Sequence, residues 1–246
     1  MSKKISLKQF LMKSGNFDNV YDCITSVRNG EITINGKVET NPNYFFNPKN
    51  TIVKFDNEKI KTVGKLYFVL NKSAGYISQK SESEKTIYDL LKKLKIDEKI
   101  INSLFAVGRL DKDTEGLIII TNDGKLSSKI MNPKHEIIKK YYSVLEKVID
   151  INKIKMLEKG IEISIDKEKY KTKPCKIKIV GEKKAYISIS EGKKRQIRKM
   201  FEAVGNKVVY LKRVSIGDLQ LGKLNVGEIN QITREEIMEK LFQQPL

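Results

Sequence analysis

Short apolar runs that end at turn-forming residues recur along the chain and predict the strands of a sheet. Two of them lie close together, at 104–107 and 117–120, and the second is followed by Thr-Asn-Asp-Gly at 121–124. Runs of this length between turn residues are typical of buried strands. The polar residues 108–116 are therefore expected to form a loop between two core strands. Such loops commonly carry functional groups, although an ordinary solvated connection with aspartates as turn formers also fits.

The rest of the chain alternates between helical and strand periods. Apolar residues three and four apart predict amphipathic helices, whereas alternating or short continuous apolar runs predict strands. The expected helices lie at 5–12, 18–28, 86–94, 123–131 and 151–159, with a further one within 191–205. The expected strands lie at 32–34, 51–55, 66–72, 139–148, 173–180 and 185–190. A break in this pattern at 61–64 reads as a linker between a small and a large domain.

The net charge of the chain indicates which class of molecule it binds. The chain of 246 residues has a formal net charge of +18, and hydrophobic residues make up 39% of it. That hydrophobic content is sufficient for a core and excludes a disordered protein. A positive surplus of this size favours a polyanion, with RNA or DNA ahead of a membrane surface. Because Lys far outnumbers Arg, a generally Lys-rich proteome is an alternative explanation.

The inventory of metal-binding and redox residues is small. Cys23 and Cys175 lie far apart, no Cys-x-x-Cys pair exists, and His135 is the single histidine. This set builds no zinc or thiol-redox site, so we expect no metal and two buried cysteines in a reducing cytosol. No stretch has the length of a membrane span and the N-terminus lacks a signal peptide's apolar core, which predicts a soluble, cytoplasmic protein without a membrane partner.

The densest positive charge lies at 190–213, where eight Lys and Arg stand against two acids. Four apolar residues at helical spacing form one stripe here, and four basic residues lie largely on the other side. The stripe consists of Ile197, Met200, Phe201 and Val204, and the basic residues are Lys194, Arg195, Arg198 and Lys199. The positive charge of such a segment favours binding to phosphates, although most Lys-rich helices are simply solvated.

Three motifs in this order resemble those of the RNA pseudouridine synthases. The first is Gly-Arg-Leu-Asp at 108–111, followed by x-x-Thr-x-Gly-Leu. The second is Lys-x-Tyr-x-Val at 140–144, in which Tyr142 matches the family's tyrosine and Tyr141 points to the opposite face of the strand. The third is Gly-Lys-x-x-Gln-Ile-Arg at 192–198. A tyrosine on a strand is most often a core residue, so the second motif depends on the first.

The resemblance implies a pseudouridine synthase fold over 66–246, which is α+β with a large mixed, mostly antiparallel sheet and flanking helices. It implies that Asp111 is the catalytic nucleophile or base, that Tyr142 packs on the target base as a possible general base, and that Arg198 pairs with Asp111. The residues expected to contact RNA are Arg109, Lys140, Lys193, Lys194, Arg195 and Lys199. Because the reaction rejoins the same base to the same sugar through carbon, it implies no cofactor.

The segment 1–60, two helices followed by small strands, resembles the small α/β RNA-binding module first seen in ribosomal protein S-four. A linker at 61–65 would join it to the catalytic domain. That module usually carries a Ser-Arg pair at the start of its second helix, where this chain has Phe-Asp-Asn-Val-Tyr-Asp at 17–22. Nine Lys and Arg against six Asp and Glu give 1–60 a net charge of only +3. RNA binding and a folding or spacer role are both consistent with this segment.

The motifs resemble the ribosomal branch of these enzymes. That branch implies ribosomal RNA in a pre-ribosomal particle as partner, a monomeric enzyme, and uridine 516 of 16S rRNA as target. The runs 111–116, 121–124, 132–135 and 201–213 resemble the small-subunit branch, whereas Lys-Arg at 194–195 is closer to the large-subunit branch. A uridine of 23S rRNA is therefore the first alternative. A non-catalytic RNA-binding factor in ribosome assembly is the second.

Overall fold

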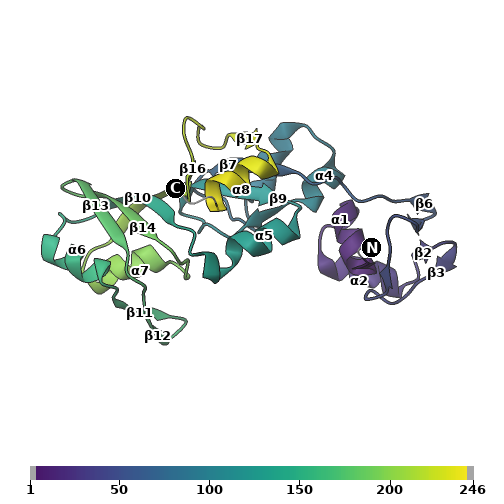
Figure 1. Cartoon of the computed structure of the whole chain (residues 1–246), viewed down its shortest axis with the longest axis horizontal. Coiled ribbons are helices and arrows are strands. Elements are labelled where there is room, and N and C mark those ends of the chain that lie inside the picture. The colour runs from purple at the N-terminus through teal and green to yellow at the C-terminus, as the bar shows by residue number, and fades with distance from the viewer. Residues whose placement is uncertain (1–3, 243–246) are drawn as a thin grey trace. The chain divides into compact units, whose positions relative to one another are not determined.

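The chain forms two compact units in the computed structural model, which describes residues 4–242 (Figure 1). The N-terminal unit contains the described residues up to Leu66 together with Leu91–Phe105. The large unit contains Tyr67–Leu90 and the described residues from Ala106 onward. The sequence predicts an uninterrupted domain over 66–246, and this division differs from it by placing 91–105 in the N-terminal unit.

The N-terminal unit pairs short helices with a small antiparallel sheet of strand order β3-β2-β5-β6. Its helices are α1 (Leu7–Ser14), α2 (Val20–Arg28) and α4 (Glu98–Ser103), with the 3-10 turn η1 (Lys92–Leu94). Its strands are β1 (Ile5–Ser6), β2 (Ile32–Ile34), β3 (Lys37–Val38), β4 (Phe45–Phe46), β5 (Val53–Phe55) and β6 (Glu58–Lys59). The two predicted helices begin two residues late, because the side chains of Ser6 and Asn19 cap them.

The helix α4 belongs to this unit because its backbone packs directly on the end of α1. Gly15 ends α1 with a φ of +71°, and a Cβ atom there would lie 1.7 Å from the carbonyl oxygen of Lys99. Only glycine tolerates both the left-handed conformation and this close approach. The sequence analysis did not predict this short helix, and periodicity does not report which elements pack together, so the assignment of 91–105 required the structure.

The large unit is built on a nine-stranded sheet, which confirms the predicted α+β class. Its strand order is β13-β14-β10-β15-β9-β7-β17, with β16 paired to β15 and β8 paired to β9. The pairings are antiparallel except the short parallel one between β9 and β15. The strands are β7 (Tyr67–Lys72), β8 (Phe105–Val107), β9 (Glu115–Thr121), β10 (Lys139–Leu145), β13 (Lys176–Gly181), β14 (Lys184–Ile189), β15 (Val208–Ile216), β16 (Leu219–Gln220) and β17 (Ile229–Gln231).

Five helices of the large unit accompany this sheet within the residues that the structure describes. They are α3 (Ile87–Leu91), α5 (Gly124–Met131), α6 (Ile151–Glu158), α7 (Gln196–Ala203) and α8 (Arg234–Phe242), with the 3-10 turn η2 (Pro133–His135). A separate hairpin, β11 (Glu162–Ile165) and β12 (Glu168–Lys171), projects beside α7 (Figure 1). The helix α8 and this hairpin were not individually predicted. None of the helices within residues 4–242 is long and apolar enough to cross a membrane.

The predicted strand at 117–120 forms the centre of the sheet. Leu117, Ile118, Ile119 and Ile120 are all fully buried, because β9 lies between β7 and β15 with side chains packed on both of its faces. The predicted loop between the two apolar runs is also present, since β8 ends at Val107 and β9 begins at Glu115. The structure therefore places the polar segment 108–114 at the end of the most buried strand of the molecule.

Candidate active site

The loop 108–114 is held in place by backbone contacts from the segment that follows β7. The hydroxyl of Ser78 donates to the carbonyl of Leu110 at 3.0 Å and accepts from its amide at 3.1 Å. The amide of Gly75 donates to the carbonyl of Lys112 at 2.8 Å. Within the loop, the amide of Thr114 donates to the carbonyl of Asp111 at 3.0 Å, which closes a tight turn. Asp111 therefore sits on a fixed turn rather than on a free loop.

Lys72 anchors the same segment from inside. It is fully buried at the end of β7, and its ammonium group donates to the carbonyls of Ser73 at 2.9 Å and Tyr76 at 2.6 Å. Burial lowers the pKa of Lys72 to about 8, although the nearby carboxylates of Asp113, Glu115 and Asp111 act in the opposite direction. Its sequence context, a strand followed by a turn, gave no sign of this role.

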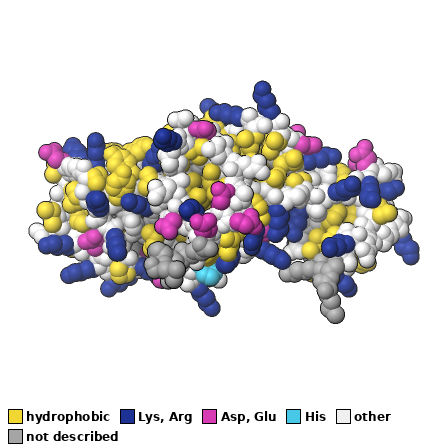
Figure 2. Space-filling view, turned by 45° about the horizontal axis from the view of Figure 1, so that its top comes forward, with side chains coloured by type: hydrophobic (Ala, Val, Ile, Leu, Met, Phe, Trp, Pro, Cys, Tyr) yellow, Lys and Arg dark blue, Asp and Glu magenta, His cyan; other side chains and the backbone are white. Residues whose placement is uncertain are grey.

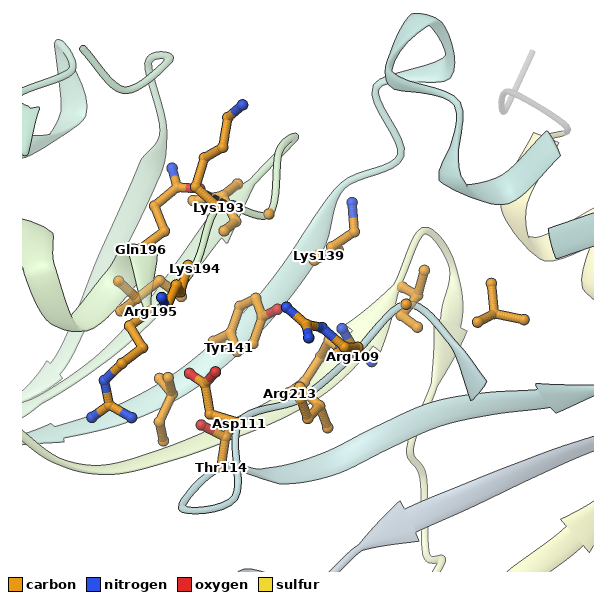
Figure 3. A pocket seen from close by; sticks show the side chains of 18 of the residues that line it. Arg109, Asp111, Thr114, Lys139, Tyr141, Lys193, Lys194, Arg195, Gln196 and Arg213 are labelled. Atoms are coloured by element: carbon orange, nitrogen blue, oxygen red, sulfur yellow. Dashed lines mark hydrogen bonds between the residues drawn. The ribbon is translucent and has the colours of Figure 1, made fainter. Parts of the chain in front are cut away.

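A cavity of about 220 Å³ lies beside the loop, in the large unit. This is below the usual range of roughly 300–1,000 Å³ for drug-sized ligands, so it suits one small group. Its lining comes from the loop, α5, β10, β14, β15 and the N-terminal end of α7. The polar lining residues are Arg109, Asp111, Thr114, Lys139, Tyr141, Lys193, Lys194, Arg195, Gln196 and Arg213 (Figure 3). The apolar part of the lining includes Ile130, Ile189, Ile197, Leu211 and Ile216.

The carboxylate of Asp111 points into this cavity. Figure 3 shows it turned toward the ring of Tyr141, with the guanidinium of Arg109 on the other side of that ring. Among the described residues, none forms a hydrogen bond or an ion pair with this carboxylate. A half-buried carboxylate that is surrounded by cationic side chains but bound to none of them is available for chemistry.

The tyrosine of the cavity is Tyr141, not Tyr142. Along β10, Tyr141, Ser143 and Leu145 are buried, whereas Lys140 and Tyr142 are half-buried on the other face. Tyr142 instead contacts two other tyrosine rings on that face. The sequence prediction took the register that starts at Lys140, and a shift by one residue exchanges the two faces of a strand. The prediction that Tyr142 lies at the site with Asp111 is therefore wrong, and Tyr141 occupies the expected position.

Arg198 does not pair with Asp111. It is buried at the start of α7, and its guanidinium contacts the Asp113 carboxylate at 3.1 Å and donates to the carbonyl of Val208 at 2.8 Å. Arg195 adds two hydrogen bonds to the same carboxylate, at 3.3 Å and 3.1 Å. Burial raises the pKa of Asp113, but the hydrogen bonds and charges of both arginines outweigh it and hold that pKa below its usual value. The predicted ion pair thus forms two residues further along the loop.

Two basic residues of the cavity escaped the sequence prediction. Arg213 on β15 is almost completely buried, and its Nε donates to the carbonyl of Leu117 at 2.7 Å. Lys139 begins β10 and donates to the carbonyl of Ile137 at 3.0 Å. Burial and the nearby charge of Arg213 lower the pKa of Lys139 to about 8. A basic residue in the inward register of a strand was the available signal for both.

The residues predicted to contact RNA divide into two groups. Arg109, Lys193, Lys194 and Arg195 line the cavity. Lys199 lies outside it and donates to the carbonyl of Ser164 at 2.6 Å, which ties α7 to β11. Lys140 lies over the ring of Tyr186, with its ammonium nitrogen 4.7 Å from the ring centre, on the face that carries Tyr142.

Comparisons with known proteins decide the family. The family described as RNA pseudouridylate synthase matches residues 66–203, which contain the loop, α7 and most of the residues that line the cavity. The chain belongs to this family. A solved structure described as a pseudouridylate synthase is similar over 96% of this chain and 99% of its own, with 32% identity and a TM-score of 0.68. That likeness also confirms the predicted fold.

Two named relatives are similar over most of their length. Ribosomal large subunit pseudouridine synthase B of Bacillus subtilis is 34% identical over 219 residues, covering 86% of this chain and 85% of the relative. Ribosomal small subunit pseudouridine synthase A of Salmonella typhimurium is 33% identical over 213 residues, covering 86% of this chain and 89% of the relative. The predicted enzyme class is confirmed: this pseudouridine synthase is an isomerase that converts uridine to pseudouridine.

Proposed function

We propose that this pseudouridine synthase acts on ribosomal RNA and that Asp111 is its catalytic residue. The observation that carries the assignment is the unpaired Asp111 carboxylate, which faces Tyr141 in a cavity sized for one small group. Conversion of uridine to pseudouridine breaks the bond between N1 and C1′ and forms a bond between C5 and C1′. The proton on C5 is lost and N1 gains one, so atoms balance without a co-reactant.

Asp111 can take part in this reaction as nucleophile or as base. An ionised carboxylate could attack the sugar or the base, or accept a proton during the isomerisation. The basic side chains of Arg109, Lys139 and Arg213 line the same cavity, where they attract anionic groups. We assign Tyr141 to pack on the target base, because it is the ring that Asp111 faces.

Arg198 acts on this site indirectly. It fixes Asp113, two residues after Asp111, and so holds the loop against α7 rather than touching the reacting atoms. Arg195 holds the same carboxylate from the entrance side of the cavity. We therefore describe Arg198 as a positioning residue, which replaces the predicted direct ion pair with Asp111.

The RNA would reach the cavity by extruding the target nucleotide. A base in a duplex is inaccessible to the Asp111 carboxylate, so the nucleotide must leave its stack before it reacts. Arg109, Lys193 and Lys194 line the cavity, where they can hold the flanking phosphates. The segment 1–60, with its helices and four-stranded sheet, is proposed as an additional RNA-binding module. Its modest charge makes it the weaker contributor.

The proposed target is uridine 516 of 16S rRNA, reached in a pre-ribosomal particle by a monomeric, cytoplasmic enzyme. One relative is named for the small ribosomal subunit, and the loop 111–116 resembles that branch. The other relative is named for the large subunit and is similarly identical, and Lys-Arg at 194–195 favours that branch. A uridine of 23S rRNA is thus the alternative target for the same chemistry. A non-catalytic assembly factor is disfavoured because such a protein has no need of an unpaired acid in a basic cavity.

Chemical mapping of pseudouridines in rRNA tests the target. RNA from cells with and without the gene is treated with carbodiimide and read by primer extension. We expect one stop in 16S rRNA to disappear with the gene, and loss of a stop only in 23S rRNA would move the enzyme to the other branch. Restoring the gene with Asp111→Asn should not restore the stop. A restored stop from that variant would disprove the role of Asp111.

A further inference from the structure

The sheet of the large unit has a second face that the reaction does not use. Along β10 and β14 the side chains that point away from the cavity are half-buried or exposed, whereas those that alternate with them are buried, except Lys139 at the start of β10. On β15, Tyr210 and Lys212 are half-buried as well. The helices α6 and α7 pack on the other side, since residues of both line a hollow together with Leu145, one of the buried residues of β10. We call the uncovered side the open sheet face. It consists of Lys140, Tyr142 and Val144 on β10, Lys176 and Lys178 on β13, Lys184, Tyr186 and Ser188 on β14, and Tyr210 and Lys212 on β15.

Three tyrosines form a continuous aromatic cluster across three adjacent strands of this face. Tyr142 is directly opposite Tyr186 in the register of β10 and β14, and their ring centres are 5.4 Å apart. Tyr142 also contacts Tyr210 of β15, with ring centres 6.2 Å apart. None of the three is fully buried, although a purely structural aromatic cluster on a sheet is normally covered by another layer. The cluster therefore presents aromatic surface to solvent.

Lysines surround the cluster. Lys176, Lys178 and Lys184 are exposed, and Lys140 lies over the ring of Tyr186. Within residues 4–242, none of these lysines or Lys212 forms an ion pair. The acid at the edge of the cluster, Glu115, accepts a hydrogen bond from the hydroxyl of Tyr210 at 2.6 Å and so is already engaged. Figure 2 shows hydrophobic side chains gathered over the end of the molecule that carries β13 and β14, with Lys and Arg around them.

Aromatic rings interleaved with unpaired cations on an open sheet are the combination that binds single-stranded nucleic acid. Bases stack on the rings without regard to sequence, while the lysines neutralise phosphates. A membrane surface would not require side chains aligned across three strands, and a protein partner would favour an apolar centre without lysines. Charge and aromatic spacing together point to RNA as the occupant.

We propose that the open sheet face binds a single-stranded segment of RNA, with bases stacked on Tyr142, Tyr186 and Tyr210. The inference deepens the proposed function, since it rests on RNA being the polymer that this enzyme handles. The face lies on the opposite side of β10 from the catalytic cavity, since Tyr141 lines the cavity and Tyr142 does not. The proposed role of this face is therefore to increase affinity for RNA outside the reacting nucleotide.

Binding of a short, fluorescently labelled oligoadenylate to the full chain tests this proposal, because that probe offers no uridine to the cavity. Fluorescence anisotropy should show that Tyr186→Leu weakens binding about tenfold, whereas Tyr186→Phe, which keeps the ring, binds like the parent. Lys178→Gln should weaken binding and lower the salt dependence of log K by about 0.7, the value for one phosphate contact on a single strand. Lys155→Gln, at an exposed position on α6, is the matched control and should change neither quantity.

Unchanged oligoadenylate affinity in a folded Tyr186→Leu variant, verified by circular dichroism, would overturn the proposal. An equal loss in Lys155→Gln would overturn it as well, since the effect would then reflect total charge. Tritium release from 5-tritiated uridine in rRNA measures pseudouridine formation and so tests the proposed function separately. Loss of oligoadenylate binding with full tritium release at saturating RNA supports the open sheet face, whereas absent tritium release from the parent enzyme would refute only the proposed function.

Discussion

At the scale of single residues, two adjacent tyrosines on β10 have opposite surroundings. Tyr141 is 8% exposed and faces Asp111 across the cavity, whereas Tyr142 packs with tyrosines on the open sheet face. Tyr141→Leu should lower kcat about tenfold or more, because it removes the ring proposed to stack on the target base. Tyr142→Leu should keep kcat within about twofold of the parent. Initial rates of tritium release at saturating RNA measure both, and the opposite ranking would return the role to Tyr142.

Sequence alone selected the acid but not its neighbours. The motif at 108–111 placed Asp111 in a loop between core strands, because apolar runs bounded by turn residues are unambiguous there. On β10 both Lys139-x-Tyr141 and Lys140-x-Tyr142 fit the start of the motif. Val144 completes the motif in the second register, where Ser143 stands in the first, so the sequence favoured the register that the structure does not place at the cavity. The sequence also could not show which carboxylate pairs with Arg198, because Asp111 and Asp113 lie in the same short loop.

At the scale of elements, the buried Lys72 links the stability of the catalytic loop to pH. An unfolded chain keeps this lysine protonated up to about pH 10.4, whereas in the fold its pKa is about 8. The unfolded state therefore binds more protons between these values, and stability gains up to about 3 kcal/mol as pH rises through this window. Urea unfolding at the two ends of the window should show this contribution as the difference in pH dependence between the parent and Lys72→Met, because the other titrating groups act on both proteins alike. The exposed Lys125→Met is the control and should retain this contribution.

The parallel pairing between β9 and β15 depends on a glycine. Gly116 has a φ of +111°, and a Cβ atom there would lie 2.2 Å from the carbonyl oxygen of Arg213. Gly116→Ala must therefore push two central strands apart, and we expect a loss of at least about 2 kcal/mol in unfolding free energy. Gly124→Ala is the matched control, since its Cβ would meet no atom within 4 Å at the start of α5. Thermal unfolding compares the two, and equal melting temperatures would contradict the tight packing at Gly116.

At the scale of the whole molecule, each of the two compact units is formed by two separate segments of the chain. Sequence predicts that removal of 1–60 leaves a soluble remainder with weaker rRNA binding. Because α4 packs on α1, we expect instead that this deletion exposes the α4 surface and lowers the melting temperature by several degrees or causes aggregation. Size-exclusion chromatography and thermal unfolding of the truncated chain measure this. A monomeric remainder with an unchanged melting temperature would show that α4 does not need α1.

The fold as a whole was more predictable than its division into units. Strands such as 66–72 and 117–120 could be predicted because buried strands contain runs of apolar residues. Asp123 indicates the start of a helix, and Asn-Gly at 35–36 indicates a hairpin. Short or polar elements such as β12 and α4 carry no such signal. Their positions depend on contacts between residues distant in sequence, which periodicity does not report.

One strand pairing in the sheet of the large unit is very short, and the cavity lies across it. The β9–β15 pairing consists of two residue pairs, Glu115 with Lys212 and Gly116 with Arg213. Asp111 precedes β9, on one side of this pairing, whereas Arg213 on β15 and Tyr141 on β10 lie on the other side, so the residues that line the cavity come from both sides. A small rotation of one half of the sheet against the other would change the separation of acid and ring while leaving each half intact. We therefore expect that a substitution far from the cavity can alter turnover by changing the angle between the two halves of the sheet at this short pairing.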